Sequence, residues 1–369
     1  MNNKASTIKA VIDDMIIRKN IAKLRTRLRQ DVKICAVLKS NAYSFGDVKV
    51  AQTIYDIVDC FAVSHLAEAT RLRRYGINKQ ILLLGVCQDF NTAIKLDLVI
   101  TICSTQEMRA LVKFLKQNPS SDKNVSVHLE INTGMNRYGI SSMGDMCEII
   151  KLAKSTENIT MDGIYTHFSH EESDLKKINE QLEFFAPFRR LFKQHFPDAV
   201  IHAACSGSAH YLPAQFDMVR IGKSLYGGYH GYETAITVTS PIIAIQDSPR
   251  LKKVGYAGEG IATKVGIIPC GYADLAHFTF ANKHSVLVKD NPHKIVGRVC
   301  MDCLMIDVSN IDEPLGSEVM IIGPYEGVRI MDICRKCGVI ACDLLCSFNF
   351  QRTLLIHEPP PLPNVRRVR

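Results

Sequence analysis

Tryptophan is absent from this 369-residue chain, and no stretch of apolar residues is long enough to span a membrane. The first residues, Met1 to Ser6, lack the apolar core of a signal peptide. We therefore expect a cytoplasmic protein that has no membrane partner. In that compartment the thirteen cysteines would be mostly reduced thiols and not a disulfide framework.

A concentrated basic surface is also lacking, although the formal net charge is +8. Lysine and arginine are scattered along the chain apart from a cluster at residues 366–369, and no basic stretch is interleaved with aromatic residues. We interpret the charge as solvated surface and expect no nucleic-acid partner. Nucleic-acid binding is the minor alternative.

The length indicates two domains, and the first part of the chain has an alternating pattern. Amphipathic helical patterns separate eight short apolar runs, which are residues 34–38, 61–63, 81–84, 98–103, 125–131, 163–168, 200–205 and 218–221. One helical pattern starts at Ser104, which forms a capping-box sequence with Glu107. Its apolar positions are Met108, Leu111, Val112 and Leu115. A second pattern has Leu175, Ile178, Leu182 and Phe185 at helical spacing.

Apolar runs separated by such helices are typical of parallel strands that are covered on both faces. Eight units predict an α/β fold, a TIM-like (β/α)8 barrel over residues 1–233. A doubly wound open sheet is the alternative. No Gly-x-Gly-x-x-Gly sequence follows the first run, which counts against a dinucleotide-binding sheet.

The pattern changes after about residue 234. Short β-branched runs separated by Gly, Pro, Asn and Asp predict a mostly β domain over residues 234–369. The runs are 236–239, 242–245, 267–268, 285–288, 295–299, 304–308 and 319–322. We expect one short helix at residues 330–336 and a stiff extended segment at the proline-rich residues 358–363.

Residues that could take part in catalysis or ligand binding follow several of the predicted barrel strands. In chain order they are Lys39, Glu130, Arg137, His167, Ser206, Arg220 and Gly222. The carboxyl ends of barrel strands form one mouth, and the loops after the last two strands usually bind phosphate. A phosphate-bearing cofactor held as a Schiff base on Lys39 is the resulting hypothesis. Taken singly, a lysine such as Lys39 at a strand end is usually solvated, and a lone histidine such as His167 is more often structural. Arg137 alone is also compatible with a surface ion pair.

The local sequences around these residues resemble the motifs of the alanine racemase family. The resemblance rests on residues 36–46 around Lys39 and on 132–139, 163–168, 202–206, 219–227, 271–274 and 297–302. These motifs follow the family's order over nearly the whole chain. The resemblance implies a barrel followed by a β domain, and a homodimer in which the second domain contributes to the partner subunit's active site.

The resemblance also implies pyridoxal 5'-phosphate as cofactor and a racemase of a small amino acid as the activity. Lys39 would hold the cofactor and act as one base. The implied cofactor contacts are Tyr43, Ser206, Gly222 and Lys223 at the phosphate, His167 near the ring, and Arg220 at the pyridine nitrogen. Arg137 and Met301 would bind the substrate carboxylate. The implied reaction interconverts L- and D-alanine and would supply D-alanine for peptidoglycan.

Three positions depart from the family pattern. The second catalytic tyrosine of the family falls on Gly260, which leaves Tyr256 and Glu259 as candidates for the second acid–base group. Glu130 stands where the family commonly has a modified lysine, and its carboxylate could pair with Arg137. Phe350 replaces a tyrosine that contacts the phosphate.

These departures leave other activities open. A roomier pocket would suit a larger amino acid such as serine, lysine or ornithine. The loss of one base would suit a one-base enzyme such as a decarboxylase, or a cofactor carrier without turnover. A zinc site is the rival interpretation of the cysteine pairs Cys300/Cys303, Cys334/Cys337 and Cys342/Cys346. We expect no metal, because Cys300 belongs to a racemase-like motif.

Overall fold

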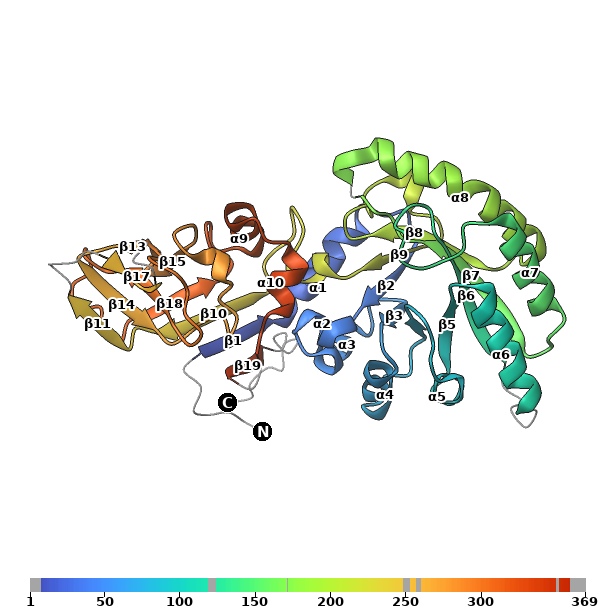
Figure 1. Cartoon of the computed structure of the whole chain (residues 1–369), viewed down its shortest axis with the longest axis horizontal. Coiled ribbons are helices and arrows are strands. Elements are labelled where there is room, and N and C mark those ends of the chain that lie inside the picture. Colours follow the sequence, from blue (N-terminus) through green and yellow to red (C-terminus); the bar gives the residue numbers. More distant parts are fainter. Residues whose placement is uncertain are drawn as a thin grey trace, which may run out of the picture. The chain divides into compact units, whose positions relative to one another are not determined.

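The computed structural model describes residues 8–118, 124–170, 172–247, 253–256, 260–349 and 352–358. The chain forms two compact units (Figure 1). We call residues 22–222 the barrel unit, and the remaining residues on both sides of it the β unit. In the part of the chain that is described, no helix has the length and apolar character needed to cross a membrane.

The barrel unit confirms the predicted (β/α)8 architecture. Its eight parallel strands close into a barrel through the pairing of the first with the last. They are β2 (Lys33–Val37), β3 (Cys60–Val63), β4 (Ile81–Leu83), β5 (Leu98–Ile102), β6 (Val125–Ile131), β7 (Ile159–Thr166), β8 (Val200–Cys205) and β9 (Met218–Ile221). All five residues of β5 are buried, as expected for a strand that is covered on both faces.

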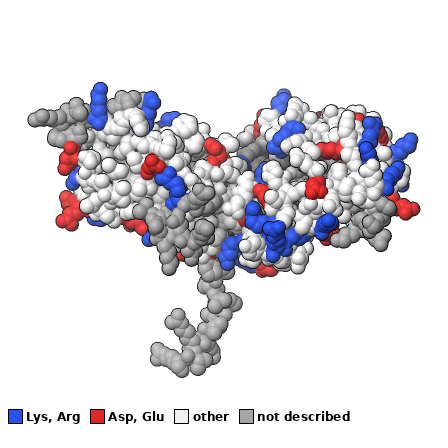
Figure 2. All heavy atoms as spheres, turned by 60° about the horizontal axis from the view of Figure 1, so that its bottom comes forward, with Lys and Arg blue, Asp and Glu red and all other residues white. Residues whose placement is uncertain are grey.

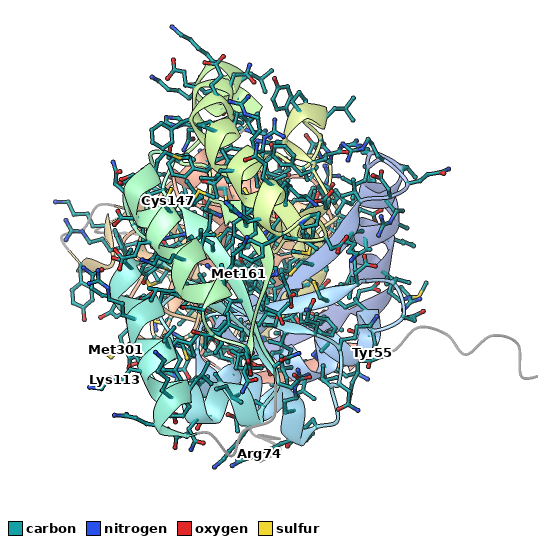
Figure 3. The ribbon with its side chains drawn as sticks, turned by 90° about the vertical axis from the view of Figure 1, so that its right-hand side faces the viewer. Tyr55, Arg74, Lys113, Cys147, Met161 and Met301 are labelled. Atoms are coloured by element: carbon teal, nitrogen blue, oxygen red, sulfur yellow. The ribbon has the colours of Figure 1, made fainter. Side chains whose placement is uncertain are left out.

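Helices cover the outside of the barrel. The helical segments between β2 and β9 are α2 (Lys39–Tyr43), α3 (Asp47–Ile54), α4 (Leu66–Arg74), α5 (Phe90–Lys95), α6 (Thr105–Gln117), α7 (Met143–Lys154), η1 (Glu172–Asp174), α8 (Leu175–His195) and η2 (Leu212–Ala214). Helix α1 (Asp14–Arg25) comes before β2, and its first eight residues belong to the β unit. Figure 3 shows the layering, with Met161 on strand β7 in the interior and Cys147 on helix α7 outside it.

Two of the predicted helical patterns can be compared with the structure. The α6 pattern is confirmed, because Met108, Leu111, Val112 and Leu115 are buried and the Ser104 hydroxyl accepts a hydrogen bond from the Glu107 amide. In α8, Ile178 and Phe185 are buried. Leu175 begins that helix and remains 43% exposed, so the buried face starts one turn later than its sequence pattern indicates.

The described residues of the β unit form three sheets. The largest has the strand order β16-β15-β18-β10-β1-β19, and the others are β11-β14-β17 and β12-β13. The strands are β1 (Ile8–Asp13), β10 (Ile236–Pro241), β11 (Ala244–Asp247), β12 (Lys253–Val254), β13 (Gly260–Ile261), β14 (Lys264–Ile268), β15 (Ser285–Val288), β16 (Asn291–Lys294), β17 (Leu304–Asp307), β18 (Glu318–Ile322) and β19 (Thr353–Glu358). The helical segments are η3 (Lys223–Tyr226), η5 (Phe278–Phe280), α9 (Ile330–Cys337) and α10 (Ala341–Cys346).

Two features of the β unit differ from the sequence prediction. The predicted barrel domain began at residue 1, but β1 pairs antiparallel with β10 and parallel with β19. The partners of β1 lie more than two hundred residues away in sequence, so no local pattern reveals this pairing. The run 295–299 contributes only an isolated bridge between Ile295 and Ile306. The proline-rich residues after 358 lie outside the described residues.

Charged side chains of both signs are spread over the face of the described residues that is visible in Figure 2. The thirteen cysteines all lie in the described residues, and no disulfide joins any two of them. Among the residues with described positions, no three His, Cys, Asp or Glu side chains come together in a group that could hold a metal ion. Cys300 and Cys303 instead pack against a small apolar cluster in the β unit.

Candidate active site at the carboxyl ends of the barrel strands

Lys39 lies directly after β2, at the carboxyl end of the barrel, and begins the short segment α2. The next five residues, Ser40 to Ser44, all have positive φ between 53° and 74°. This left-handed conformation is unfavourable for residues that carry a Cβ atom, at roughly 1–2 kcal/mol per residue. The chain therefore turns sharply at Lys39 and brings the Tyr43 side chain, which is 8% exposed, against Gly222 after β9.

A compact cradle lies where β8 and β9 end. The backbone amide of Gly222 donates to the Ser206 hydroxyl at 3.1 Å, and both groups are buried. The Tyr43 hydroxyl lies against the α-carbon of Gly222, so closely that a Cβ atom there would be 2.8 Å from the Tyr43 Cζ. Position 222 therefore accepts only glycine without displacement of Tyr43. Two hydroxyls and a backbone amide at this end of a barrel can together bind a phosphate group.

Arg220 lies beside this cradle and is only 3% exposed. Its guanidinium donates to the backbone oxygens of Thr166 at 2.8 Å and Ala203 at 3.0 Å, and it contacts Nδ1 of His202 at 2.6 Å. A longer contact of 3.4 Å reaches Nδ1 of His167. These contacts hold the guanidinium in one orientation.

The pKa of His167 is lowered by its surroundings. Burial, followed by the positive charges of Arg220, Arg137 and Lys39, lowers the pKa of His167 to about 3. The imidazole is therefore neutral near pH 7. Of the three cations, Arg220 contacts the ring directly, and Arg137 and Lys39 act on it at longer range.

Glu130 is buried and has a different partner from the one we expected. Its carboxylate accepts from the Tyr165 hydroxyl at 2.7 Å and from the Cys103 thiol at 3.6 Å. Arg137, by contrast, is exposed on the loop after β6, and the described residues show no ion pair between it and Glu130. The reason is the strand register, which places Glu130 directly beside Tyr165 on β7.

Tyr165 links Glu130 to Arg220. The Tyr165 ring stacks on the His202 ring at 4.7 Å between centroids, and the Arg220 guanidinium lies 4.9 Å from the centre of the Tyr165 ring. Neither Tyr165 nor His202 was singled out from the sequence. The periodicity of two along β7 and β8 was the available signal, because alternate residues of a strand point to the same side.

Arg137 lines a cavity of about 390 Å³ at the ends of β4, β5 and β6. Its other lining residues are Val86, Cys103, Glu107, Asn132, Asn136, Tyr138 and Gly139. The cavity combines the Arg137 guanidinium and the Glu107 carboxylate with amide and hydroxyl groups, a composition that suits a small polar ligand.

The remaining predicted residues belong to the β unit. Lys223 begins η3, and its ammonium lies 5.1 Å from the centre of the Tyr229 ring. Tyr256 is 69% exposed and Met301 is 54% exposed. Gly260 lies in β13, whereas Glu259 and Phe350 fall outside the described residues. The structure thus brings together the barrel-unit candidates, and these β-unit candidates remain sequence predictions.

Backbone hydrogen bonds join two of the sequence motifs in the β unit, residues 271–274 and residues 297–302. The backbone oxygens of Cys300 and Met301 accept from the amides of Tyr272 and Ala273, each at 3.0 Å. Any side chain at Gly271 would collide with the backbone at Met301. The segment 271–274 therefore fixes the backbone that carries Met301.

Comparisons with known proteins agree with this architecture. A family model described as the alanine racemase N-terminal domain matches residues 12–230, and one described as the C-terminal domain matches residues 235–354. An alanine racemase 2 of Caldanaerobacter subterraneus subsp. tengcongensis is 32% identical over 350 residues, which cover 89% of each chain. An alanine racemase of Streptococcus equi subsp. zooepidemicus is 31% identical over 91% of this chain and 94% of its own.

Solved structures give the same result. The alanine racemase from E. faecalis has a TM-score of 0.87 at 27% identity, and the match covers 97% of this chain and 100% of that one. The alanine racemase from Clostridium difficile has a TM-score of 0.85 at 28% identity over 96% of both chains. With both domains matched in order over most of its length, this chain belongs to the alanine racemase family.

Proposed function

We propose that this protein is a pyridoxal-phosphate-dependent racemase that interconverts L- and D-alanine, and that D-alanine for peptidoglycan is its product. The observation that carries the proposal is the arrangement in the barrel unit. Lys39, the buried guanidinium of Arg220 and the cradle of two hydroxyls and one amide all follow or end barrel strands, in a chain whose relatives are alanine racemases. The relatives' names favour alanine over serine, lysine or ornithine.

The barrel residues fit the cofactor. The Ser206 and Tyr43 hydroxyls and the Gly222 amide would hold the phosphate, because they already lie together and a side chain at 222 would fill the space. The Lys223 amide follows directly in sequence and would add a donor. When bound, pyridoxal phosphate supplies an electron-poor ring that stabilises negative charge at the α-carbon of an amino acid.

Arg220 and Lys39 have distinct roles in this proposal. Arg220 would face the pyridine nitrogen, and an arginine cannot release a proton there, so the nitrogen stays unprotonated and side reactions are suppressed. The Lys39 amine would anchor the cofactor and then accept and return a proton on one face of the substrate α-carbon. His167 would pack near the ring as a neutral imidazole.

Racemisation needs a second acid–base group on the opposite face, and the family position for it is Gly260. We propose that Tyr256, which is exposed in the β unit, provides this group from the partner subunit of a homodimer. Met301 would reach the substrate carboxylate from the same partner, opposite Arg137. A structure described as an alanine racemase of Clostridium difficile in complex with cycloserine, 28% identical with a TM-score of 0.82, supports a small ligand.

A racemisation assay in heavy water tests the proposal. The purified protein should convert either enantiomer of alanine into labelled product of the opposite hand, and should act more slowly on serine, lysine and ornithine. Lys39→Ala should abolish both the reaction and the absorbance of the lysine-bound cofactor. Labelling of one enantiomer without inversion would identify a one-base enzyme, release of carbon dioxide would identify a decarboxylase, and the absence of any turnover would identify a carrier.

A further inference from the structure

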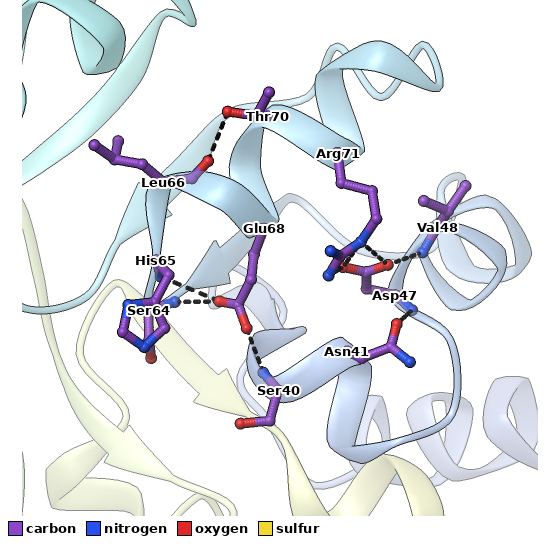
Figure 4. A network of polar contacts seen from close by, with 10 residues as sticks. All are labelled: Ser40, Asn41, Asp47, Val48, Ser64, His65, Leu66, Glu68, Thr70 and Arg71. Carbon is purple, nitrogen blue, oxygen red and sulfur yellow. Dashed lines mark hydrogen bonds and ion pairs between the residues drawn. The ribbon is translucent and has the colours of Figure 1, made fainter. Parts of the chain in front are cut away.

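The turn that follows Lys39 is held at both of its ends by a single helix. Five consecutive residues in the left-handed region, Ser40 to Ser44, need contacts that keep them there. Local backbone hydrogen bonds are present within the turn, such as that from the Ser44 amide to the Ser40 oxygen at 3.0 Å. Two side chains of helix α4 add contacts from outside (Figure 4).

The first of these side chains is Glu68, which is only 8% exposed. One carboxylate oxygen accepts from the Ser40 amide at 2.6 Å, and the other accepts from the amides of Ser64 and His65 at 2.9 and 3.1 Å. A carboxylate offers acceptors only, so it matches three converging N–H groups. Glu68 thereby ties the loop after β3 to the residue next to Lys39.

A comparison within the barrel shows what is unusual about Glu68. Glu107 has the equivalent place on α6, and its carboxylate accepts from the Cys103 amide at 2.6 Å. Both acids therefore support the loop that precedes their own helix. Only Glu68 also reaches across to a residue that adjoins the proposed reactive lysine.

The second side chain is Arg71, one helical turn after Glu68 and on the same face of α4. Its guanidinium forms a bidentate pair with Asp47, with Nε–Oδ1 at 3.0 Å and Nη2–Oδ2 at 2.5 Å. Asp47 is 1% exposed and begins α3, at the far end of the turn. The Asp47 amide also donates to the Asn41 side chain at 3.1 Å, which closes the turn on itself.

We propose that Glu68 and Arg71 are positioning residues that hold the two ends of this turn, so that the Lys39 amine and the Tyr43 hydroxyl face one bound pyridoxal phosphate. This proposal rests on the proposed function. Lys39 adjoins the residue that Glu68 holds, and Tyr43 lies between the two held ends, with its hydroxyl against Gly222. In this proposal Glu68 mainly sets the position of the Lys39 amine, and Arg71 mainly sets the position of the Tyr43 hydroxyl that would contact the phosphate.

The experiment measures how readily Lys39 is labelled. Full-length protein is incubated with increasing pyridoxal phosphate and reduced with borohydride, which converts the carbon–nitrogen double bond on a lysine into a stable bond. Peptide mass spectrometry then quantifies the label on Lys39 and on other lysines. In Glu68→Gln the side-chain NH2 group would face a backbone N–H group, so one hydrogen bond to the loop is lost. We therefore expect the half-saturating concentration of pyridoxal phosphate to rise about tenfold, and a larger share of the label to appear on other lysines.

Arg71→Met is assayed with both pyridoxal phosphate and pyridoxal, which lacks the phosphate. We expect the preference for the phosphorylated compound to fall about tenfold, because the Tyr43 contact is misplaced. A merely structural defect would raise the half-saturating concentrations of pyridoxal phosphate and pyridoxal by the same factor. That result would overturn the role of Arg71. Because the Arg71 side chain is 41% exposed, this variant also decides the case if Glu68→Gln does not fold.

Two matched variants serve as controls. Glu148→Gln removes a carboxylate from the outer helix α7, where it pairs with Arg109, and Arg74→Met removes an exposed guanidinium from the same helix as Arg71. Both should label at Lys39 as the unmodified protein does. Labelling curves of Glu68→Gln that coincide with those of Glu148→Gln would overturn the positioning role while leaving the proposed function intact. An unmodified protein that is not labelled at Lys39 would overturn both.

Discussion

The guanidinium of Arg220 donates a hydrogen bond of 2.6 Å to Nδ1 of His202 inside the barrel. Arginine has no acceptor, so Nδ1 of His202 must be unprotonated and its proton lies on Nε2. That proton points to Nδ1 of His128 at 2.9 Å, which makes His128 the next acceptor in the chain. Burial and the charge of Arg220 lower the pKa of both imidazoles, so one buried cation is surrounded by neutral rings.

This relationship predicts the effect of replacing the cation. Arg220→Met would leave the buried acceptors on His202, Thr166 and Ala203 without their donor. We expect the free energy of unfolding in urea to fall by ~3 kcal/mol or more, because each unsatisfied buried acceptor costs roughly 1–3 kcal/mol. Arg137→Met, at an exposed position, should change it by less than ~0.5 kcal/mol. Equal losses in the two variants would contradict the buried network.

Acid should destabilise the β unit through His284. Burial lowers the pKa of His284 to about 4, while an unfolded histidine titrates near 6.5. Between these values the unfolded chain binds a proton that the folded chain does not. The free energy of unfolding therefore falls as the pH falls, by up to ~1.4 kcal/mol per pH unit from this residue. His284→Gln can still donate to the Ile321 oxygen, so urea unfolding between pH 7 and 4 should show a shallower loss. An unchanged slope would refute the prediction.

The cradle makes a prediction for position 222. In Gly222→Ala the new methyl group would overlap Tyr43, so we expect a loss of ~1–3 kcal/mol in stability and weaker binding of pyridoxal phosphate. Tyr43→Ala removes the obstacle, so the double variant should be less unstable than the sum of the single variants. Gly144→Ala, in the first turn of α7, is the control and should be nearly neutral. Additive effects of the two cradle substitutions would argue against this close contact.

Glu130 and Tyr165 should be energetically coupled. Tyr165→Phe keeps the ring on His202 and removes the hydroxyl that the Glu130 carboxylate accepts from. A double-mutant cycle with Glu130→Gln, measured by urea unfolding, should give a coupling of ~1–2 kcal/mol. Tyr138→Phe with Glu130→Gln is the comparison pair, since Tyr138 is 43% exposed, and its coupling should be near zero. A Tyr165 coupling no larger than that would count against the contact.

Tyr256 is the proposed second acid–base group and can be tested separately from Lys39. Tyr256→Phe should lower the racemisation rate by ~100-fold or more, because a positioned proton donor contributes on that order. Exchange of the α-proton of one alanine enantiomer in heavy water should persist, since Lys39 remains. Tyr325→Phe, another exposed tyrosine of the β unit, should leave the racemisation rate unchanged. A racemisation rate unaffected by Tyr256→Phe would remove Tyr256 from the mechanism.

The placement of the barrel-unit site residues depended on strand ends that are visible in the sequence. Lys39, His167 and Ser206 each follow an apolar run that the structure contains as β2, β7 or β8. Closure of the barrel then brings separate strand ends to one mouth. The Glu130–Arg137 pair could not be judged in this way, because the partner of Glu130 is set by the β6–β7 register and not by sequence spacing.

What the amino-acid sequence determined by itself is the set of barrel strands, the order of the motifs and the lysine after the first barrel strand. Periodic apolar patterns encode these features locally. The tertiary structure alone decided that β1 joins β10 and β19, that Tyr43 meets Gly222, and that Glu68 supports the residue beside Lys39. The physical reason is that these contacts join residues far apart in the chain, and only closure of the sheets brings them within hydrogen-bonding distance.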